Sequence, residues 1–340
     1  MRAEHESKSP LTREDDLLAR IRNQLSLSRR SSSALRLAIG DDAAIFRPRH
    51  GYELILTCDW FLQGTHFQLD RHPPDSVGWK SLARAVSDLA AMGAEPRCFL
   101  LSLALPAAQT GKWLNAFLKG LRTASRRLNC PAAGGDTTRR DQVLINVTVV
   151  GECRQGRAVL RTGASPGDAI FVSGRLGEAD YGLRLMLSSK HRPDARDPRL
   201  RKHLYPQARL ALGAWLAKQR LASAMMDLSD GLSTDLPRLC QASGVGARIE
   251  VNRLPVPRLL RLEAKKYDSL ELACNGGDDY ELLFTVAPRN VANIPRQITS
   301  VPVTKIGQVT EQRKILLVLG DGTTCDLRQL GWDPFRTRSG

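Results

Sequence analysis

Helix-type and strand-type hydrophobic patterns alternate along both halves of this chain. In the first half, YELILTCDWF and CFLLSLALP are predicted strands, and residues 76–92 form a predicted helix that ends at Gly93. In the second half, AIFVSG is a predicted strand, followed by predicted helices at GEADYGLRLMLSS and PQARLALGAWLAK. A turn-rich segment, GASPGD, separates the two series. This alternation favours α/β layers over a helical bundle or a β-sandwich, so we predict an α/β fold.

The length and composition predict a globular protein of about two domains. A chain of 340 residues exceeds one ordinary hydrophobic core, and its 42% hydrophobic and 25% charged residues are typical of soluble proteins. No apolar run reaches the ~20 residues that cross a bilayer, and the N-terminal segment is too charged for a secretory signal. We therefore expect a cytoplasmic protein with no membrane partner.

The cysteines and the net charge narrow the possible functions. The seven cysteines are widely spaced and include no C-x-x-C pair, which favours reduced thiols over a disulfide framework or a zinc site. The net charge of +15 fits either a nucleic-acid surface or a basic exterior that attracts phosphorylated ligands. Aromatic residues are only 5% and no nucleic-acid module is recognisable, so we expect no nucleic-acid partner. The basic run at 190–203 is predicted to be a solvated loop.

The segment DLSDGLSTDL, at 227–236, has two interpretations. Asp227 and Asp230 flank Ser229 just before leucines at helical spacing, which is typical of a helix N-cap. Two carboxylates on a short turn also suit a hard metal ion. We expect both: the aspartates bind metal, while Ser229 and Asp230 start the helix.

Further acidic residues recur in small-residue segments that we interpret as turns. They include Asp41 and Asp42, Asp59, Asp136, and Asp278 and Asp279. Asp88 differs, because it lies at the edge of the apolar face of the predicted helix and therefore needs a cation, a donor or solvent. Clustered aspartates that hold Mg²⁺ are what phosphoryl transfer requires. The chain lacks a P-loop, a dinucleotide-binding glycine motif and the protein-kinase motifs, so glycine-turn amides and Arg161 are the candidates for assisting ATP binding.

Seven segments, taken in order, resemble the motif series of the bacterial thiamine-monophosphate kinase family. They are GDDAA, CDWFLQGTHF, SDLAAMGAEP, GGDTTR, LRTGASPGD, DLSDGLSTDL and GGDDYELLFTV, with a weaker tail at GWDPF. The resemblance covers about Ile39 to Phe284 and extends to the superfamily of aminoimidazole ribonucleotide synthetase. It implies a two-domain, synthetase-like α/β (α+β) fold. Residues 1–153 would form a domain that binds ATP and metal and pairs its sheet across a homodimer, and residues 154–340 a second α/β domain.

The resemblance also implies an activity and a set of site residues. The activity is ATP-dependent phosphorylation of thiamine monophosphate to thiamine diphosphate, assisted by several Mg²⁺ ions. The metal positions correspond to Asp42, Thr57, Cys58, Asp59, Asp88, Asp136, Asp227 and Asp230. The ATP positions correspond to Gly135, Arg161 and Ser229, and the substrate positions to His66, Asp278 and Trp332.

The chain departs from the family pattern at three places. Cys58 replaces a usual hydroxyl residue, and a thiol is a poor ligand for Mg²⁺, so water, the Cys58 carbonyl or Thr57 would substitute for it. Asp278 replaces a frequent Glu and has a shorter reach, and TREDDLLARI replaces a Gly-Glu-Phe start.

No protein nucleophile or general base is expected, because the acceptor phosphate, with a second pKa near ~6, is already ionised at neutral pH. Two alternatives remain open from the residues. One is a synthetase of the same superfamily that activates an amide, and the other is a non-catalytic nucleotide-binding or nucleic-acid-binding protein.

Overall fold

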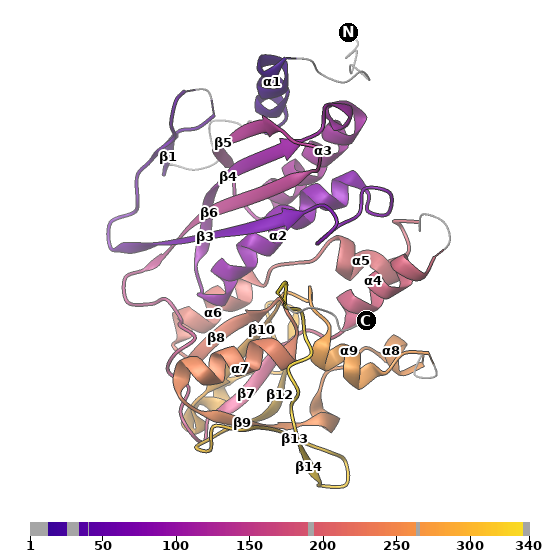
Figure 1. The fold of residues 1–340 in the computed structure, drawn as a ribbon. Coiled ribbons are helices and arrows are strands. Elements are labelled where there is room, and N and C mark those ends of the chain that lie inside the picture. Colours follow the sequence, from indigo (N-terminus) through magenta and orange to yellow (C-terminus); the bar gives the residue numbers. More distant parts are fainter. Residues whose placement is uncertain (1–12, 26–33, 40, 190–193, 263–265, 336–340) are drawn as a thin grey trace. The chain divides into compact units, whose positions relative to one another are not determined.

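A computed structural model of the chain describes residues 13–25, 34–39, 41–189, 194–262 and 266–335. The chain folds into two compact units. Unit 1 comprises Met1–Val86 and Pro96–Glu152, and unit 2 comprises Ser87–Glu95 and Cys153–Gly340. Each unit builds its own sheet and helices (Figure 1).

Unit 1 is built on a four-stranded sheet with the strand order β3-β6-β4-β5. Its helices are α1 (Glu14–Leu25), α2 (Pro74–Ala91) and α3 (Lys112–Arg127), with a 3-10 turn at Ala107–Thr110. Its strands are β1 (Leu35–Leu37), β2 (Ile45–Phe46), β3 (Tyr52–Leu62), β4 (Glu95–Leu105), β5 (Ala132–Arg139) and β6 (Leu144–Arg154). Helices α2 and α3 pack on one face of this sheet (Figure 1), where Leu101, Leu103 and Val147 are buried.

Helix α2 confirms the predicted helix in this region, with a start two residues earlier. It ends before Gly93, whose φ of 70° provides the left-handed conformation that terminates many helices. The last turn of α2, from Ser87, belongs to unit 2.

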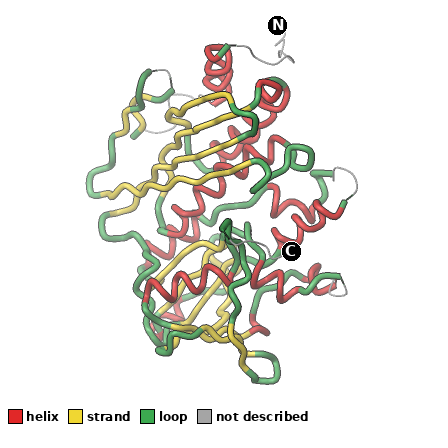
Figure 2. The backbone as a smooth tube through the Cα atoms, viewed as in Figure 1, coloured by secondary structure: helices red, strands yellow, loops and turns green. Residues whose placement is uncertain are grey.

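Unit 2 contains a larger sheet with the order β14-β13-β9-β12-β7-β10-β8, to which β11 adds by pairing with β12. Its strands are β7 (Ala169–Ser173), β8 (Ala222–Leu228), β9 (Gly246–Glu250), β10 (Glu281–Val286), β11 (Gln297–Ile298), β12 (Val301–Thr310), β13 (Ile315–Val318) and β14 (Thr324–Asp326). Its helices are α4 (Glu178–Ser188), α5 (Arg201–Leu204), α6 (Leu210–Gln219), α7 (Leu232–Ser243), α8 (Arg258–Leu262) and α9 (Ser269–Asn275), with 3-10 turns at Pro198–Leu200, Val251–Arg253 and Pro288–Asn293. In Figure 2 the strands of each sheet run side by side and the helices flank them.

Both faces of the unit 2 sheet are covered, so apolar side chains on β7, β8 and β10 are buried on both faces, together with a few polar ones. Along β8, Ala224, Met226 and Leu228 contribute to one core with α7, while Met225 contributes to a second core with α6 and the last turn of α2. Because successive side chains of a strand alternate between faces, Asp227 is directed to the Met225 side. This places a carboxylate next to the α2 terminus.

Three predicted turns or loops are wrong. Asp59 is not in a turn: it lies within β3, as the strand prediction for YELILTCDWF requires. The GGDTTR segment is not a turn: it lies in β5, which pairs in parallel with β4. The basic run at 190–203 is not a loop throughout, because Arg201–Leu204 form α5 and His203 is buried; residues 190–193 lie outside the described ranges. Within those ranges, we find no helix that combines the length and the apolarity needed to cross a membrane.

Candidate functional site

Asp227 is the most deeply buried of the predicted metal ligands. Its side chain lies on β8 and the residue is 3% exposed. From the last turn of α2, Ser87 Oγ donates a hydrogen bond of 2.6 Å to Asp227 Oδ2. Burial, followed by the negative charge of Asp88, raises the pKa of Asp227 to about 8, which the Ser87 hydrogen bond and the charge of Arg161 partly oppose. The structure thus brings Asp88, Arg161 and Asp227 together.

The Asp88 and Asp227 carboxylates form a donor set that suits a divalent cation. Two anionic groups that repel each other in a buried setting are stabilised by a hard cation with oxygen ligands. Nowhere in the described ranges is a group of three or more His, Cys, Asp or Glu side chains arranged to hold a metal ion. A cation bound here would therefore receive only part of its coordination shell from the pair, and water or phosphate oxygens would have to complete it.

Asp235 stabilises the turn between β8 and α7, and the side chains of Ser229 and Asp230 do not cap α7. Asp235 is buried in α7, and its Oδ2 accepts hydrogen bonds from the backbone N–H groups of Ser229 (3.0 Å) and Asp230 (2.9 Å). Helix α7 begins after Gly231, which has no side chain with which to cap it, so the predicted start at Ser229 and Asp230 is wrong. Arg238 donates to both Asp235 (2.8 Å) and Asp230 (2.5 Å).

Main-chain hydrogen bonds join this turn to two segments that are distant in sequence. We use the term main-chain junction for residues 228–230 together with their hydrogen-bond partners Asp278, Tyr280 and Trp332. The Asp278 N–H donates to the Ser229 carbonyl at 2.8 Å, and the Trp332 N–H donates to the Asp230 carbonyl at 2.9 Å. Gly331 permits this approach, since a Cβ there would lie 2.2 Å from the Asp230 carbonyl oxygen. The junction brings four predicted site residues together: Ser229, Asp230, Asp278 and Trp332.

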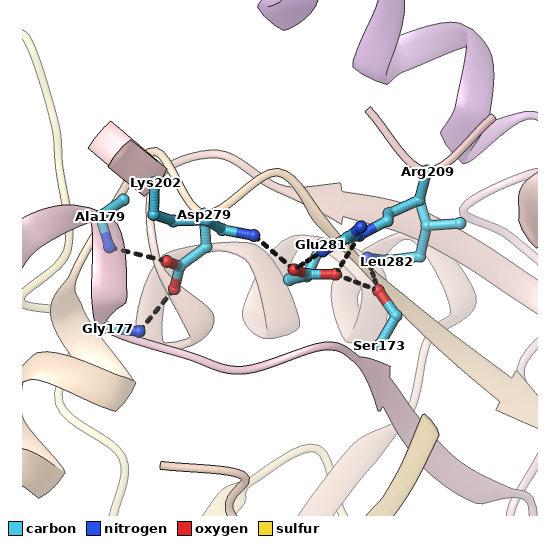
Figure 3. Close-up of polar contacts among 8 residues, drawn as sticks. All are labelled: Ser173, Gly177, Ala179, Lys202, Arg209, Asp279, Glu281 and Leu282. Atoms are coloured by element: carbon cyan, nitrogen blue, oxygen red, sulfur yellow. Dashed lines mark hydrogen bonds and ion pairs between the residues drawn. The ribbon is translucent and has the colours of Figure 1, made fainter. Parts of the chain in front are cut away.

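Buried acids fix the segment that follows Asp278 (Figure 3). Asp279 accepts hydrogen bonds from Gly177 N (2.6 Å) and Ala179 N (3.1 Å) at the start of α4, and burial raises its pKa to about 7. Glu281 accepts from Ser173 Oγ at 2.6 Å and pairs with Lys202 and Arg209 at 2.5 Å. Burial alone would raise the pKa of Glu281, but the two cations hold it at about 2.

In unit 1, β3 separates the predicted metal positions between its two faces. Asp59 is half-buried and accepts a bidentate pair of hydrogen bonds from Arg84 of α2, at 2.7 and 3.0 Å. Thr57 shares this face by the period of two, whereas Cys58 is exposed on the opposite face. The Cys58 thiol therefore does not accompany the Asp59 carboxylate, which leaves Thr57 or a main-chain carbonyl as the nearby oxygen donor.

The remaining metal and nucleotide positions of unit 1 lie apart from Asp59. Gly135 and Asp136 are exposed on β5, which is separated from β3 by β6 and β4. Three strand spacings amount to roughly 14 Å, which is too far for one ion to bind both Asp59 and Asp136 in one copy. Asp42 is exposed in a bend, where its N–H donates to the Asp41 side chain at 2.9 Å.

His66 has a defined hydrogen-bond direction. Its Nδ1 accepts a hydrogen bond from the Leu62 backbone N–H at 3.0 Å. In a neutral imidazole the other nitrogen then carries the proton, so Nε2 is a donor. This tautomer suits a contact with an anionic or carbonyl acceptor.

Sequence reasoning missed several residues that shape the site. Asp235 is the third aspartate of DLSDGLSTD and could be noticed from the sequence. Its hydrogen bonds to the Ser229 and Asp230 amides could not, because they depend on the fold. Asp279 and Glu281 were visible as acids in an apolar segment, whereas their partners Lys202 and Arg209 are distant in sequence. Only the folded chain identifies these pairs.

Two family models match the chain over most of its length. The AIR synthase related protein N-terminal domain matches residues 40–153, and the AIR synthase related protein C-terminal domain matches residues 165–319. The chain is 36% identical to the thiamine-monophosphate kinase of Escherichia coli (strain K12) over 328 residues, covering 95% of this chain and 98% of that protein. It is 33% identical to the Bacillus subtilis (strain 168) enzyme of the same name over 311 residues, covering 89% and 95%.

Solved structures agree with these sequence matches. The thiamine-monophosphate kinase from Stenotrophomonas maltophilia K279a superposes with a TM-score of 0.80 at 35% identity, covering 92% of this chain and 98% of that one. AaThiL complexed with AMPPCP and TMP gives a TM-score of 0.74 at 33% identity, covering 98% and 99%. The hydrogenase maturation protein HypE in complex with ATP shares the fold, with a TM-score of 0.76 at 19% identity. The expected two-domain fold is confirmed, and the chain belongs to the thiamine-monophosphate kinase family of AIR synthase related proteins.

Proposed function

We propose that this protein transfers the γ-phosphoryl group of ATP to thiamine monophosphate, giving thiamine diphosphate and ADP. The observation that carries this proposal is the main-chain junction. It unites the proposed ATP contact Ser229 and the proposed metal ligand Asp230 with the proposed substrate residues Asp278 and Trp332. A phosphoryl transfer needs this proximity, because catalysis rests mainly on positioning two polyanions.

The residues of the chain have distinct roles in this proposal. Arg161 and the Gly135 backbone bind ATP phosphates, and the His66 Nε2–H donates to the substrate. Trp332 is 38% exposed, so its indole is available to stack on the cationic thiazolium or the flat pyrimidine. The acceptor phosphate is already ionised, and no side chain needs to remove a proton from it.

Several Mg²⁺ ions are part of the proposal. The residues that would hold them are Asp42, Asp59, Asp88, Asp136, Asp227 and Asp230, with an oxygen donor from Thr57 or the Cys58 main chain. The buried Asp227 carboxylate, its raised pKa and the neighbouring charge of Asp88 support a cation at these two residues. When bound, Mg²⁺ would neutralise negative charge on the nucleotide phosphates. The separation of Asp59 from Asp136 across the sheet supports more than one ion.

We also propose a homodimer formed by unit 1 and a cytoplasmic location. The sheet face opposite α2 and α3 exposes Leu54, Leu56, Trp60 and Leu100, at 38–66% of their surface, which supports burial against a second copy. The seven cysteines are free thiols, which suits a reducing compartment. In this arrangement residues 1–153 form the domain for ATP, metal and dimerisation.

The test is a chromatographic assay with purified protein, ATP, Mg²⁺ and thiamine monophosphate. We expect thiamine diphosphate and ADP to appear in equal amounts, and EDTA to abolish both. Untouched ATP in protein shown to bind Mg²⁺ would contradict the proposal. ADP released with inorganic phosphate, in place of thiamine diphosphate, would point to another acceptor.

A further inference from the structure

The Asp278 carboxylate is the exposed member of an otherwise buried group. The Asp278 side chain is 29% exposed to solvent, whereas His203 is 1% exposed and Tyr280 is 2% exposed. The Tyr280 hydroxyl donates to Asp278 Oδ1 at 2.8 Å, and His203 Nδ1 lies 3.6 Å from Asp278 Oδ2. Each oxygen of the carboxylate thus faces a protein group, and the exposed part of the side chain is accessible to a ligand.

The backbone of this segment is strained. Asp278 has φ = 68° and Tyr280 has φ = 49°, a left-handed conformation that is unfavourable for residues with a Cβ. Such conformations persist only where the surroundings enforce them, and they concentrate at functional sites.

The surroundings here are the buried acids and the junction. Asp279 is fixed at the start of α4, and Glu281 is fixed by Lys202 and Arg209 (Figure 3). The N–H groups of Asp278 and Tyr280 donate to the carbonyls of Ser229 and Leu228, both at 2.8 Å.

Helix α5 contacts two of the three carboxylates of the segment, those of Asp278 and Glu281. Lys202 pairs with buried Glu281, and its neighbour His203 faces Asp278. The segment is thereby held by side chains of α5 and by main-chain carbonyls of the turn after β8.

We propose that Tyr280, assisted by His203, is a positioning residue that directs the Asp278 carboxylate toward the ring portion of thiamine monophosphate. This inference rests on the proposed function. A carboxylate repels the phosphate end of the substrate and attracts the cationic thiazolium and the amino-bearing pyrimidine. Trp332, anchored to the carbonyl next to that of Ser229, presents an aromatic surface suited to the same rings.

The test compares Tyr280→Phe with Tyr267→Phe. Tyr267 lies between α8 and α9, where its ring packs edge-on against Tyr181 at 5.3 Å, so the control removes a hydroxyl from an aromatic contact of another kind. We expect Tyr280→Phe to raise the KM for thiamine monophosphate about tenfold, the effect of losing one hydrogen bond to a charged group. The KM for ATP and kcat should stay within about twofold, and the control should match the wild type.

Thiamine, which has the rings but no phosphate, identifies the end of the substrate involved. As a competitive inhibitor it should weaken in Tyr280→Phe by the same factor as thiamine monophosphate. An unchanged inhibition constant for thiamine would overturn the inference, as would equal losses for ATP and thiamine monophosphate.

A double-mutant cycle with Asp278→Asn separates positioning from simple destabilisation. If Tyr280 acts through Asp278, the Phe substitution should have no further effect on the KM in the Asn background; multiplied effects would contradict the inference. His203→Ala provides a second variant with Tyr280 intact, and we expect a smaller rise in the same KM alone. Wild-type protein that fails to phosphorylate thiamine monophosphate would overturn the proposed function and this inference together, whereas an active wild type with an unaffected Tyr280→Phe would overturn the inference alone.

Discussion

The burial of Asp227 disfavours its ionised form and at the same time makes the residue suited to bind a cation. Burial and the charge of Asp88 make its ionised form unfavourable in the metal-free protein. The same surroundings favour binding of a cation, because a cation stabilises the ionised carboxylate that burial disfavours. A residue of this kind should matter more to activity than to folding.

Replacing Asp88 or Asp227 by Asn should abolish most kinase activity, at least about a hundredfold in kcat/KM, since each change removes an anionic ligand. Because Asn removes an unfavourable buried charge, the melting temperature of metal-free Asp227→Asn should equal or exceed that of the wild type. Activity assays and thermal melts check both expectations. Asp326→Asn, on exposed β14, is the matched control and should change neither quantity. Near-normal turnover in either variant would remove that residue from the metal site.

Asp279 should make stability depend on pH between about 4 and 7. Its pKa rises from 3.8 to about 7 on folding, so the native state binds more protons than the unfolded state in this window. The free energy of unfolding should therefore fall as the pH rises, by up to about 4 kcal/mol. Glu281, whose folded pKa is about 2, acts in the opposite sense but only below about pH 4.5.

Denaturant unfolding at several pH values between 4.5 and 7.5 measures this dependence. Asp279→Asn should reduce the slope without abolishing it, because burial also raises the pKa of Asp227 to about 8 and that of Asp235 to about 7. Asp326→Asn should preserve the slope. Equal slopes in wild type and Asp279→Asn would show that Asp279 does not titrate in this window.

At the residue scale, the sequence identified positions more readily than their partners. Asp227 and Asp278 could be marked because acids are unusual beside apolar runs. Asp235 could not be assigned its role, since it binds the Ser229 and Asp230 amides only after α7 packs on β8. The cap prediction failed for the same reason: Gly231 starts the helix, and the polar side chains before it are used elsewhere.

At the scale of elements, long periodic segments were predictable and short ones were not. Helix α2 and strand β4 carry enough apolar residues to reveal their period. Strand β5 contains glycine and threonine residues that read as a turn, and it becomes a strand by pairing with β4. Helix α5 has four residues, too few for a periodic signal, and is stabilised by tertiary contacts.

The contact between α2 and α3 yields a prediction at this scale. Gly120 of α3 lies so close to α2 that a Cβ there would be 1.9 Å from the Asp75 carbonyl oxygen. Gly120→Ala should therefore push the helices apart and destabilise the protein by roughly 2 kcal/mol, despite the better helix propensity of alanine. Thermal or denaturant unfolding measures the change. Thr123→Ala, on the exposed side of α3, should stay within about 0.5 kcal/mol; equal effects would exclude the steric explanation.

At the scale of the whole molecule, one face of the unit 1 sheet exposes large apolar side chains that a single chain leaves uncovered. Leu54, Leu56 and Trp60 alternate along β3 with half-buried residues, and their side chains share one face. A soluble chain gains stability by covering such a face. The Cys58 thiol lies on the same face and would be covered with it in the proposed dimer.

Leu56→Glu should convert a dimer into a monomer, because it introduces a charge at the centre of this face. Light scattering after gel filtration should give the mass of two 37.5 kDa chains for the wild type and of one chain for the variant. Leu262→Glu, at a leucine of α8 that is 72% exposed, is the matched control and should leave the mass unchanged. A monomeric wild type would contradict the proposed dimer.

The main-chain junction has a consequence for how this protein can diverge. Its hydrogen bonds join backbone groups of Leu228, Ser229 and Asp230 to those of Asp278, Tyr280 and Trp332. Backbone groups persist when a side chain is exchanged. Substitutions at 278 and 332 would therefore change the side chains offered to a substrate without removing these main-chain hydrogen bonds. Under the proposed function, exchanging the exposed side chains at this junction should therefore change which acceptor is phosphorylated, provided that Gly331 is kept.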